Sequence, residues 1–206
     1  MNQMISSAIR TKKLAGAIVL ALGLLTVGSL PTSSQDRGKP EIIQGVITGT
    51  GTQSGQLTNF RIAIYEFSTP EDKQIMVDAF QKGQNTGLFN ALSRMRSVGR
   101  VAITGTLGYD VKYIRWFPTP TGRTIKFITD RQISMGEAWT DSRSQAYNLT
   151  GGILDLNDGD KKKSTGVIYP AAQLVIDKDG ELSIDLANNP WKVASIIDNK
   201  GTPGVN

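Results

Sequence analysis

The chain has 206 residues, with 23 lysines and arginines against 18 aspartates and glutamates, and it contains neither histidine nor cysteine. The missing residue types exclude serine–histidine triads, cysteine nucleophiles, and thiolate or imidazole metal sites, and they remove the commonest general base. No serine lies in a Gly-x-Ser-x-Gly elbow or a Ser-x-x-Lys pattern. The composition favours a non-enzymatic protein without a cofactor. Carboxylate chemistry, a Ser–Lys pair, a reactive lysine and an oxygen-ligand metal site stay open.

Residues 1–34 have the pattern of a secretory signal peptide. Three basic residues precede an apolar run from 14 to 25, which is short for a membrane span. Small residues offer two cleavage points, after Ser29 and after Ser34. An uncleaved membrane anchor is the alternative, and it is the only route by which we expect a membrane contact. An exported chain without cysteine must be held together by packing alone, so we expect a periplasmic or secreted bacterial protein.

The charge of the chain falls when the signal is removed. Residues 1–34 hold three basic and no acidic side chains, which leaves 20 basic against 18 acidic side chains. So small an excess gives no argument for nucleic acid or a membrane surface as partner. The partner is expected to be a protein or a small ligand. We expect a disordered stretch at 35–40, a single α+β domain at 41–200 and a disordered tail at 201–206.

Alternation of apolar and polar residues predicts a series of β-strands after the signal. Short turns join most of them, as at Asp177-Lys178-Asp179-Gly180, and this favours antiparallel neighbours. Residues 134–144 are expected to form a loop or a short helix. The predicted strands cover residues 42–51, 57–67, 98–106, 109–117, 123–129, 147–156, 173–176, 181–186 and 191–197, with Gly151-Gly152 interrupting the sixth.

Two short helices are predicted between the second and third strands. Thr69 is a suitable N-cap, Pro70 tolerates the first helical position, and Asp72 can complete a capping box. The first helix is expected to end at Gly83, and the second to run from 88 to 95. Together the elements predict an α+β fold that is mainly β. It consists of an antiparallel, curled or partly closed sheet with one pair of short helices after the second strand.

The hairpin from 109 to 127 combines aromatic and basic residues. A five-residue loop at 118–122 would place Phe117 opposite Arg123 and Tyr113 opposite Phe127, with Arg115 on the same apolar face. An arginine there needs an acceptor, either an internal partner, which we favour, or a ligand carboxylate or phosphate. A register one residue different pairs Trp116 with Arg123 in a cation–π contact. The candidate ligand-binding residues are Arg115, Trp116, Tyr113 and Arg123.

Two patterns of acidic residues raise the question of a metal. The first register sets Asp110 opposite Asp130, so either a cation lies between them or the register differs by one residue. The segment 155–160 resembles a calcium loop, but its glycine is fifth instead of sixth and the twelfth position holds no glutamate. An acidic turn is the better interpretation of that segment. Asp110 and Asp130 are the candidate metal ligands.

Short motifs resemble those of a group of uncharacterised secreted bacterial proteins. The motifs are Gly99-Arg100, Phe117-Pro118-Thr119, Thr121-Gly122-Arg123 and Ile133-Ser134, and the likeness covers most of the chain after the signal. That group has no established activity. The resemblance implies an envelope domain and assigns no site residues.

Two hypotheses for the function follow from the residues. The first is a non-enzymatic exported domain that binds a partner surface or a small ligand in a cavity of the sheet. The second is a carboxylate-dependent hydrolase acting on envelope glycans, which needs two acids about 5–10 Å apart in a cleft. The acids nearest to aromatic residues are Asp110, Asp130, Glu66 and Glu137.

Overall fold

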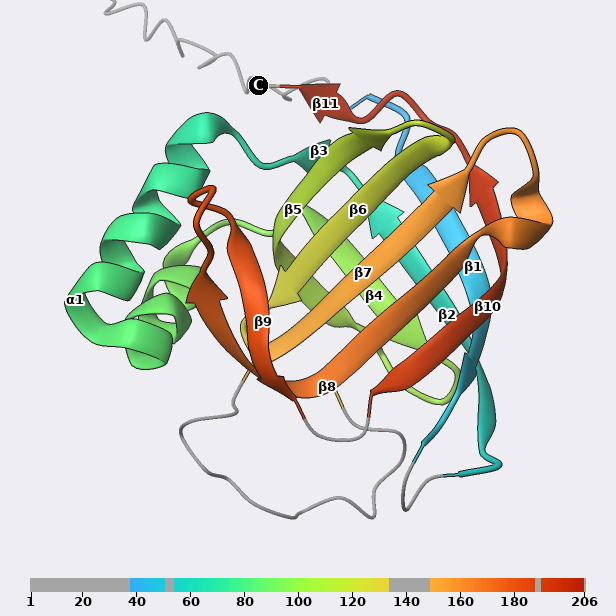
Figure 1. The fold of residues 1–206 in the computed structure, drawn as a ribbon, viewed down its shortest axis with the longest axis horizontal. Helices are drawn as coiled ribbons and strands as arrows, with labels where there is room; N and C mark the ends of the chain where they lie inside the picture. The colour runs from blue at the N-terminus through green and yellow to red at the C-terminus, as the bar shows by residue number, and fades with distance from the viewer. Residues whose placement is uncertain (1–37, 51–53, 134–148, 188–189, 206) are drawn as a thin grey trace, which may run out of the picture. The chain divides into compact units, whose positions relative to one another are not determined.

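A computed structural model describes residues 38–50, 54–133, 149–187 and 190–205. Eight strands of this part form a closed antiparallel barrel (Figure 1). The barrel closes because β10 pairs with β1 on one side and with β8 on the other. The strands in barrel order are β10 (Trp191–Asn199), β1 (Glu41–Thr48), β2 (Leu57–Ile64), β4 (Gly99–Ile103), β5 (Tyr109–Thr119), β6 (Gly122–Thr129), β7 (Leu149–Asn157) and β8 (Thr165–Ile176).

The mainly β, antiparallel character of the prediction is confirmed, whereas the curled or partly closed sheet is corrected to a closed barrel. β9 (Leu182–Ala187) pairs with β8 and lies outside the closed ring. β7 continues through Gly151-Gly152, and the expected interruption is reduced to a shift in its pairing with β8 between Leu149 and Gly151. Gly152 lies opposite Phe127, and a β-carbon at this glycine would overlap the Phe127 ring. Glycine here therefore makes room for an aromatic side chain in the barrel.

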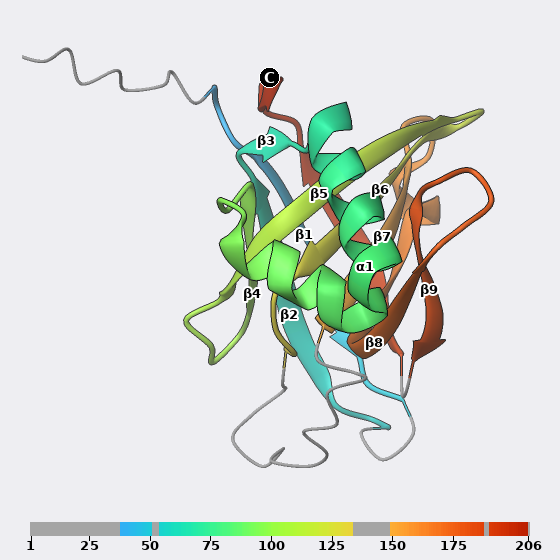
Figure 2. The ribbon, with the colours of Figure 1, turned by 90° about the vertical axis from the view of Figure 1, so that its left-hand side faces the viewer.

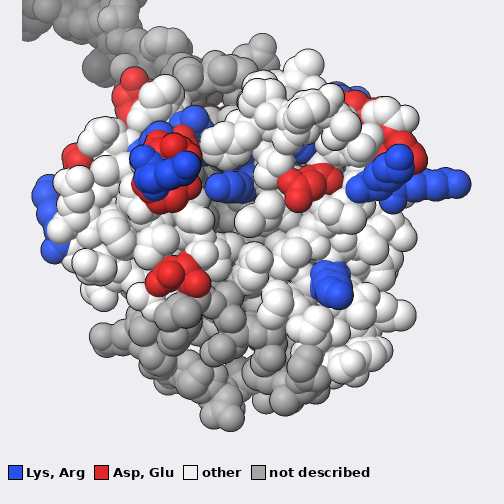
Figure 3. All heavy atoms as spheres, in the orientation of Figure 1, with Lys and Arg blue, Asp and Glu red and all other residues white. Residues whose placement is uncertain are grey.

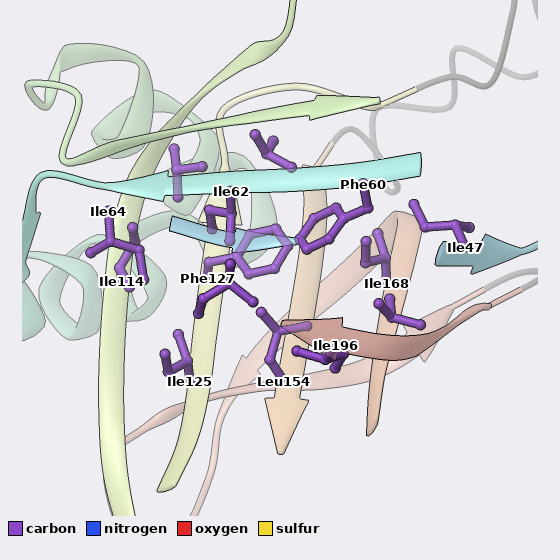
Figure 4. Packing of buried hydrophobic residues seen from close by; sticks show 14 of the residues in the cluster. Ile47, Phe60, Ile62, Ile64, Ile114, Ile125, Phe127, Leu154, Ile168 and Ile196 are labelled. Atoms are coloured by element: carbon purple, nitrogen blue, oxygen red, sulfur yellow. The ribbon is translucent and has the colours of Figure 1, made fainter. Parts of the chain in front are cut away.

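The interior of the barrel is filled by its own side chains. Residues at alternate positions of each strand point inward, as Figure 4 shows for Ile62, Ile125 and Leu154. The rings of Phe60 and Phe127 stack with centroids 6.2 Å apart, and both residues are buried. An eight-stranded barrel is just wide enough for such filling. Ligand sites must therefore be sought at its ends or on its outer faces.

Helix α1 (Pro70–Arg94) begins as the sequence predicts. Thr69 accepts a hydrogen bond from the Asp72 amide at 3.1 Å, and the Asp72 carboxylate accepts one from the Thr69 amide at 2.9 Å. The predicted pair of short helices is corrected to one helical element. Its first arm does end at Gly83 as predicted, since Gly83 and Gln84 leave helical geometry, and the second arm follows directly after this kink, earlier than the predicted residue 88 (Figure 2).

The helix follows the third strand and not the second. The predicted strand 57–67 is interrupted at Tyr65, and its last two residues form β3 (Glu66–Phe67). β3 pairs in parallel with β11 (Gly204–Val205). α1 then packs on the outside of the barrel, mainly against β8 and β5. A second buried cluster joins the two layers, with Met76, Leu88, Leu92, Tyr113, Leu149 and Leu174 among its members.

The hairpin of β5 and β6 has a shorter loop than predicted. Thr119 pairs with Gly122, so the turn contains two residues, and Trp116 lies opposite Ile125. From Tyr113 to Thr119 both predicted registers are therefore wrong, whereas the pair of Val111 with Thr129 agrees with the first of them. A bulge between Val111 and Tyr113 further changes which residues share a face. Val111 and Ile114 belong to the barrel core, whereas Tyr113 belongs to the cluster beneath the helix.

Residues 38–40 and 201–205 belong to the two terminal stretches that are expected to be disordered, and they bind each other. The amide of Thr202 donates to the carbonyl of Lys39 at 2.8 Å, and the amide of Lys39 donates to the Thr202 hydroxyl at 3.2 Å. The expected signal peptide, its cleavage points and the segment 134–144 lie outside the described residues. Among the helical residues that are described, none forms a segment long and apolar enough to cross a membrane.

Candidate functional site

Three charged side chains meet at one end of the barrel. Arg123 of β6 binds the carboxylate of Glu41 of β1, and the same guanidinium nitrogen lies 3.0 Å from Oδ2 of Asp198 of β10. Each residue lies near the end of its strand, two positions from a core residue. Because side chains alternate between the two faces of a strand, each of the three faces inward. Glu41 is only 2% exposed. The network therefore replaces the apolar core at this end.

The electrostatics of the network depend on its burial. Desolvation raises the pKa of Glu41; the Arg123 guanidinium partly offsets this effect, and the Asp198 carboxylate adds to it. Two polar atoms of the network are buried without a hydrogen-bond partner among the described residues, namely Arg123 Nε and Asp198 Oδ1. A buried acceptor without a donor is costly, so the Asp198 oxygen is a natural contact point for a bound group.

A cavity of about 460 Å³ adjoins this network. Asp198 is one of its lining residues, together with apolar Leu156 and Ile196. The remaining lining side chains are polar or charged: Lys39, Asn157, Asp158, Lys161, Ser164, Asn199 and Lys200. These residues come from the ends of β7, β8 and β10, from the segment before β1, and from the short 3-10 helix η3 (Lys161–Lys163). The volume lies within the range of small-molecule sites.

The three lysines around this cavity are not equivalent. Lys200 donates to Asp158 at 2.8 Å, and this hydrogen bond lowers the pKa of the Asp158 carboxyl below its ordinary value. Lys39 and Lys161 have no ion pair with any residue in the described ranges. The cavity thus offers two unpaired cations and one unpaired carboxylate oxygen. Such a set suits a ligand that carries both an anionic group and a hydrogen-bond donor.

The structure divides the four predicted ligand-binding residues between two faces of the hairpin. Arg123 is in the barrel-end network. Trp116 is 47% exposed and does not line the cavity. Arg115 lies 3.7 Å from Glu181 and 5.8 Å from the Phe117 ring, so its partners are internal. Tyr113 lies beneath α1, where burial is the main cause that raises the pKa of its hydroxyl to about 12.

The two predicted metal candidates have separate partners. Asp110 lies 3.3 Å from Arg100 and 3.9 Å from Lys112, whereas Asp130 lies 3.4 Å from its neighbour Arg131. The pairing of Val111 with Thr129 sets Asp110 and Asp130 at the next opposed positions, as the first register predicted, but β6 ends at Thr129 and each aspartate has its own basic partner. Within the described ranges, no three histidine, cysteine or acidic residues form a group suited to a metal ion.

Sequence reasoning missed Glu41, Asp198 and the lysines of the cavity. Glu41 precedes the predicted first strand, and Asp198 follows the predicted last strand. One signal was present in the sequence. Each of the three charged residues of the network, Glu41, Arg123 and Asp198, lies two positions from an apolar core residue of its strand and therefore on the same face of that strand. A charged side chain on this inward face needs a buried partner.

No protein-family model, curated protein sequence or solved structure matches this chain.

The distribution of charge on the surface gives further guidance. Figure 3 shows basic and acidic side chains next to one another on the face over β6, β7 and β8, without an area of a single sign. This face does not have the basic stripe of a nucleic-acid interface. The barrel-end cavity is therefore the best-defined candidate site.

Proposed function

We propose that this protein is an exported, non-enzymatic binding domain whose barrel-end cavity holds a small zwitterionic molecule, such as a free amino acid or a short peptide. One observation carries the proposal. Asp198 lines the cavity and keeps one buried carboxylate oxygen without a partner among the described residues, while Lys39 and Lys161 line the same cavity unpaired. The ligand ammonium would bind Asp198, and its carboxylate would bind the lysines.

The runner-up function is a carboxylate-dependent hydrolase acting on envelope glycans. Glu41 and Asp198 are two neighbouring acids, which such an enzyme needs. Both carboxylates, however, are bound by one guanidinium nitrogen, and Glu41 is almost completely buried. A substrate bond cannot reach Glu41, which does not line the cavity, so only one of the two acids is available. The geometry therefore supports binding better than hydrolysis.

Calorimetric titration of the mature protein with a panel of free amino acids tests the binding proposal. For an amino acid that binds, we expect the matching amine without a carboxylate, and the matching acid without an amine, to bind far more weakly. Lys161→Gln is expected to weaken binding, because it removes a lining cation without touching the buried network. Lys162→Gln is the matched control, since this neighbour does not line the cavity. Absence of saturable binding across the panel would refute the proposal.

Export rests on the N-terminal signal pattern. We expect the protein in the envelope fraction to have lost its first 29 to 34 residues. Intact-mass measurement of protein from that fraction checks this. A mass that still includes Met1 to Leu25 would instead identify a membrane anchor.

A further inference from the structure

A second hollow lies on the outer face of the barrel, where β10, β1, β2 and β4 are neighbours (Figure 1). Its volume is about 680 Å³. A bulge in β10 shapes one side of it: the pairing with β1 shifts between Gln44 and Val46, and Ser195 adopts a positive φ of 53°. The turn after β4 forms another side, with Gly105 at φ 85°. We name this hollow the outer groove.

The outer groove and the barrel-end cavity are separate sites. Ser195 and Ile197 of β10 line the groove, whereas Ile196 and Asp198 of the same strand line the cavity. The two sets alternate along β10 and so point to opposite faces of the sheet. Figure 4 accordingly shows Ile196 among the side chains of the barrel core. A ligand in one site does not compete for residues of the other.

Arg61 is the charged residue of the outer groove. It is exposed and has no acidic side chain among the described residues that line the groove with it. Five other arginines, at positions 96, 100, 115, 123 and 131, lie within ion-pair distance of an aspartate or glutamate. Arg61 has no such pair in the described ranges. Its guanidinium is therefore free to bind a planar carboxylate through two parallel hydrogen bonds.

The other lining residues supply hydrogen bonds and aliphatic surface. Gln44 and Asn59 carry amides, and Thr104 and Ser195 carry hydroxyls. Ile197 is 56% exposed, and it lines the groove together with Val46 and Ala102. Amides and hydroxyls match the hydroxyl groups of a sugar ring. The exposed aliphatic side chains match the C–H face of that ring.

We propose that the outer groove binds an acidic saccharide, in which a uronate carboxylate pairs with Arg61 and the sugar hydroxyls contact the amide and hydroxyl side chains. Charge complementarity selects this ligand over a neutral sugar, because the groove holds a cation without a counter-charge. The combination of hydroxyl-binding groups with exposed Ile197 selects it over a simple inorganic anion.

Calorimetric titration of the mature protein with trigalacturonate tests this proposal, and maltotriose serves as the neutral probe. We expect saturable binding of trigalacturonate and at least about tenfold weaker binding of maltotriose, because the charge-assisted pair is missing. Arg61→Gln is expected to weaken trigalacturonate binding by about tenfold or more. Ile197→Ser is expected to weaken both probes. Arg100→Gln, which removes the same charge outside the groove, is expected to bind like the parent.

Three results would overturn the proposal. They are absence of saturable trigalacturonate binding, equal binding of the two trisaccharides, and an Arg61→Gln variant that binds as the parent does. Inhibition of trigalacturonate binding by equimolar acetate would also contradict it, since that result indicates an anion site without sugar recognition. Arg61 is exposed, so Arg61→Gln is expected to fold, and a thermal melt equal to that of the parent checks this.

Discussion

Arg123 in β6 binds Glu41 in β1 although the two residues are 82 positions apart in the chain. The same guanidinium also binds Asp198, so one cation connects three strands at the end of the barrel. Removing one partner of a buried ion pair costs more than the pair contributes, because an uncompensated charge remains. Arg123 thereby becomes the residue on which this end of the barrel depends.

We predict that Arg123→Met lowers the free energy of unfolding by about 3–5 kcal/mol, because it leaves Glu41 and Asp198 buried without their cation. Arg100→Met is the control. Its pair with Asp110 is roughly half exposed, so we expect a change of at most about 1 kcal/mol. Urea titrations of both variants measure the difference. Equal effects of the two substitutions would show that the network contributes no more than a surface ion pair.

A second prediction concerns the pH dependence of Glu41. Burial raises the pKa of this carboxyl above its ordinary value of 4.5, so the folded state favours the protonated form. Its contribution to stability is then fully present below the unfolded-state pKa, and it is lost as pH rises through the folded-state pKa. We expect the stability difference between the parent and Glu41→Gln to decline as the pH rises from below 4.5 towards neutrality. Urea titrations across this range test it.

The opposite slope would contradict this prediction. A difference that grows with pH would mean that the attraction of Arg123 exceeds the cost of burial, so that the pKa of Glu41 is lowered. Titrating groups outside the network are common to both proteins, so their effects cancel in the difference, whereas Asp198 interacts with Glu41 and contributes to the measured slope.

The kink of α1 brings its two arms together at Gly87. A β-carbon at this position would overlap the carbonyl group of Ala79 in the preceding arm. We expect Gly87→Ala to destabilise the protein by about 1–3 kcal/mol, because the arms must separate. Gly83→Ala, at the kink itself, meets no atom within 4 Å and does not require a positive φ. Thermal melts compare the two, and a Gly87→Ala protein as stable as Gly83→Ala would refute the close contact.

The fourth prediction concerns Arg115. Its neighbour Glu181 also binds Lys73 at 2.6 Å, so this carboxylate keeps a cation when the arginine is removed. We expect Arg115→Met to change stability by less than about 1 kcal/mol, because the methionine stem can pack on Phe117. Thermal melts with and without phosphate provide the check. Stabilisation by phosphate in the parent that disappears in the variant would identify an anion site on this face.

Several features of the fold follow from local sequence alone. Strand alternation and short turns predict antiparallel pairing, and the capping box of Thr69 and Asp72 forms as expected, because these signals involve residues close together in the chain. The hairpin shows where local signals fail. Its turn contains two residues instead of five, and a one-residue shift in pairing moves a side chain to the other face of the sheet. Tyr113 and Arg115 therefore lie apart from Arg123.

The sequence by itself determined which chemistry this protein lacks, since the absence of histidine and cysteine holds for any fold, and it determined the mainly β character. The tertiary structure decided the closure of the barrel, because β10 pairs with nearby β8 and also with β1, from which most of the chain separates it. It also decided the site. Strand register and closure bring Glu41, Arg123 and Asp198 together, and local periodicity can place each charge on the inner face of its strand but cannot say which residue it meets there.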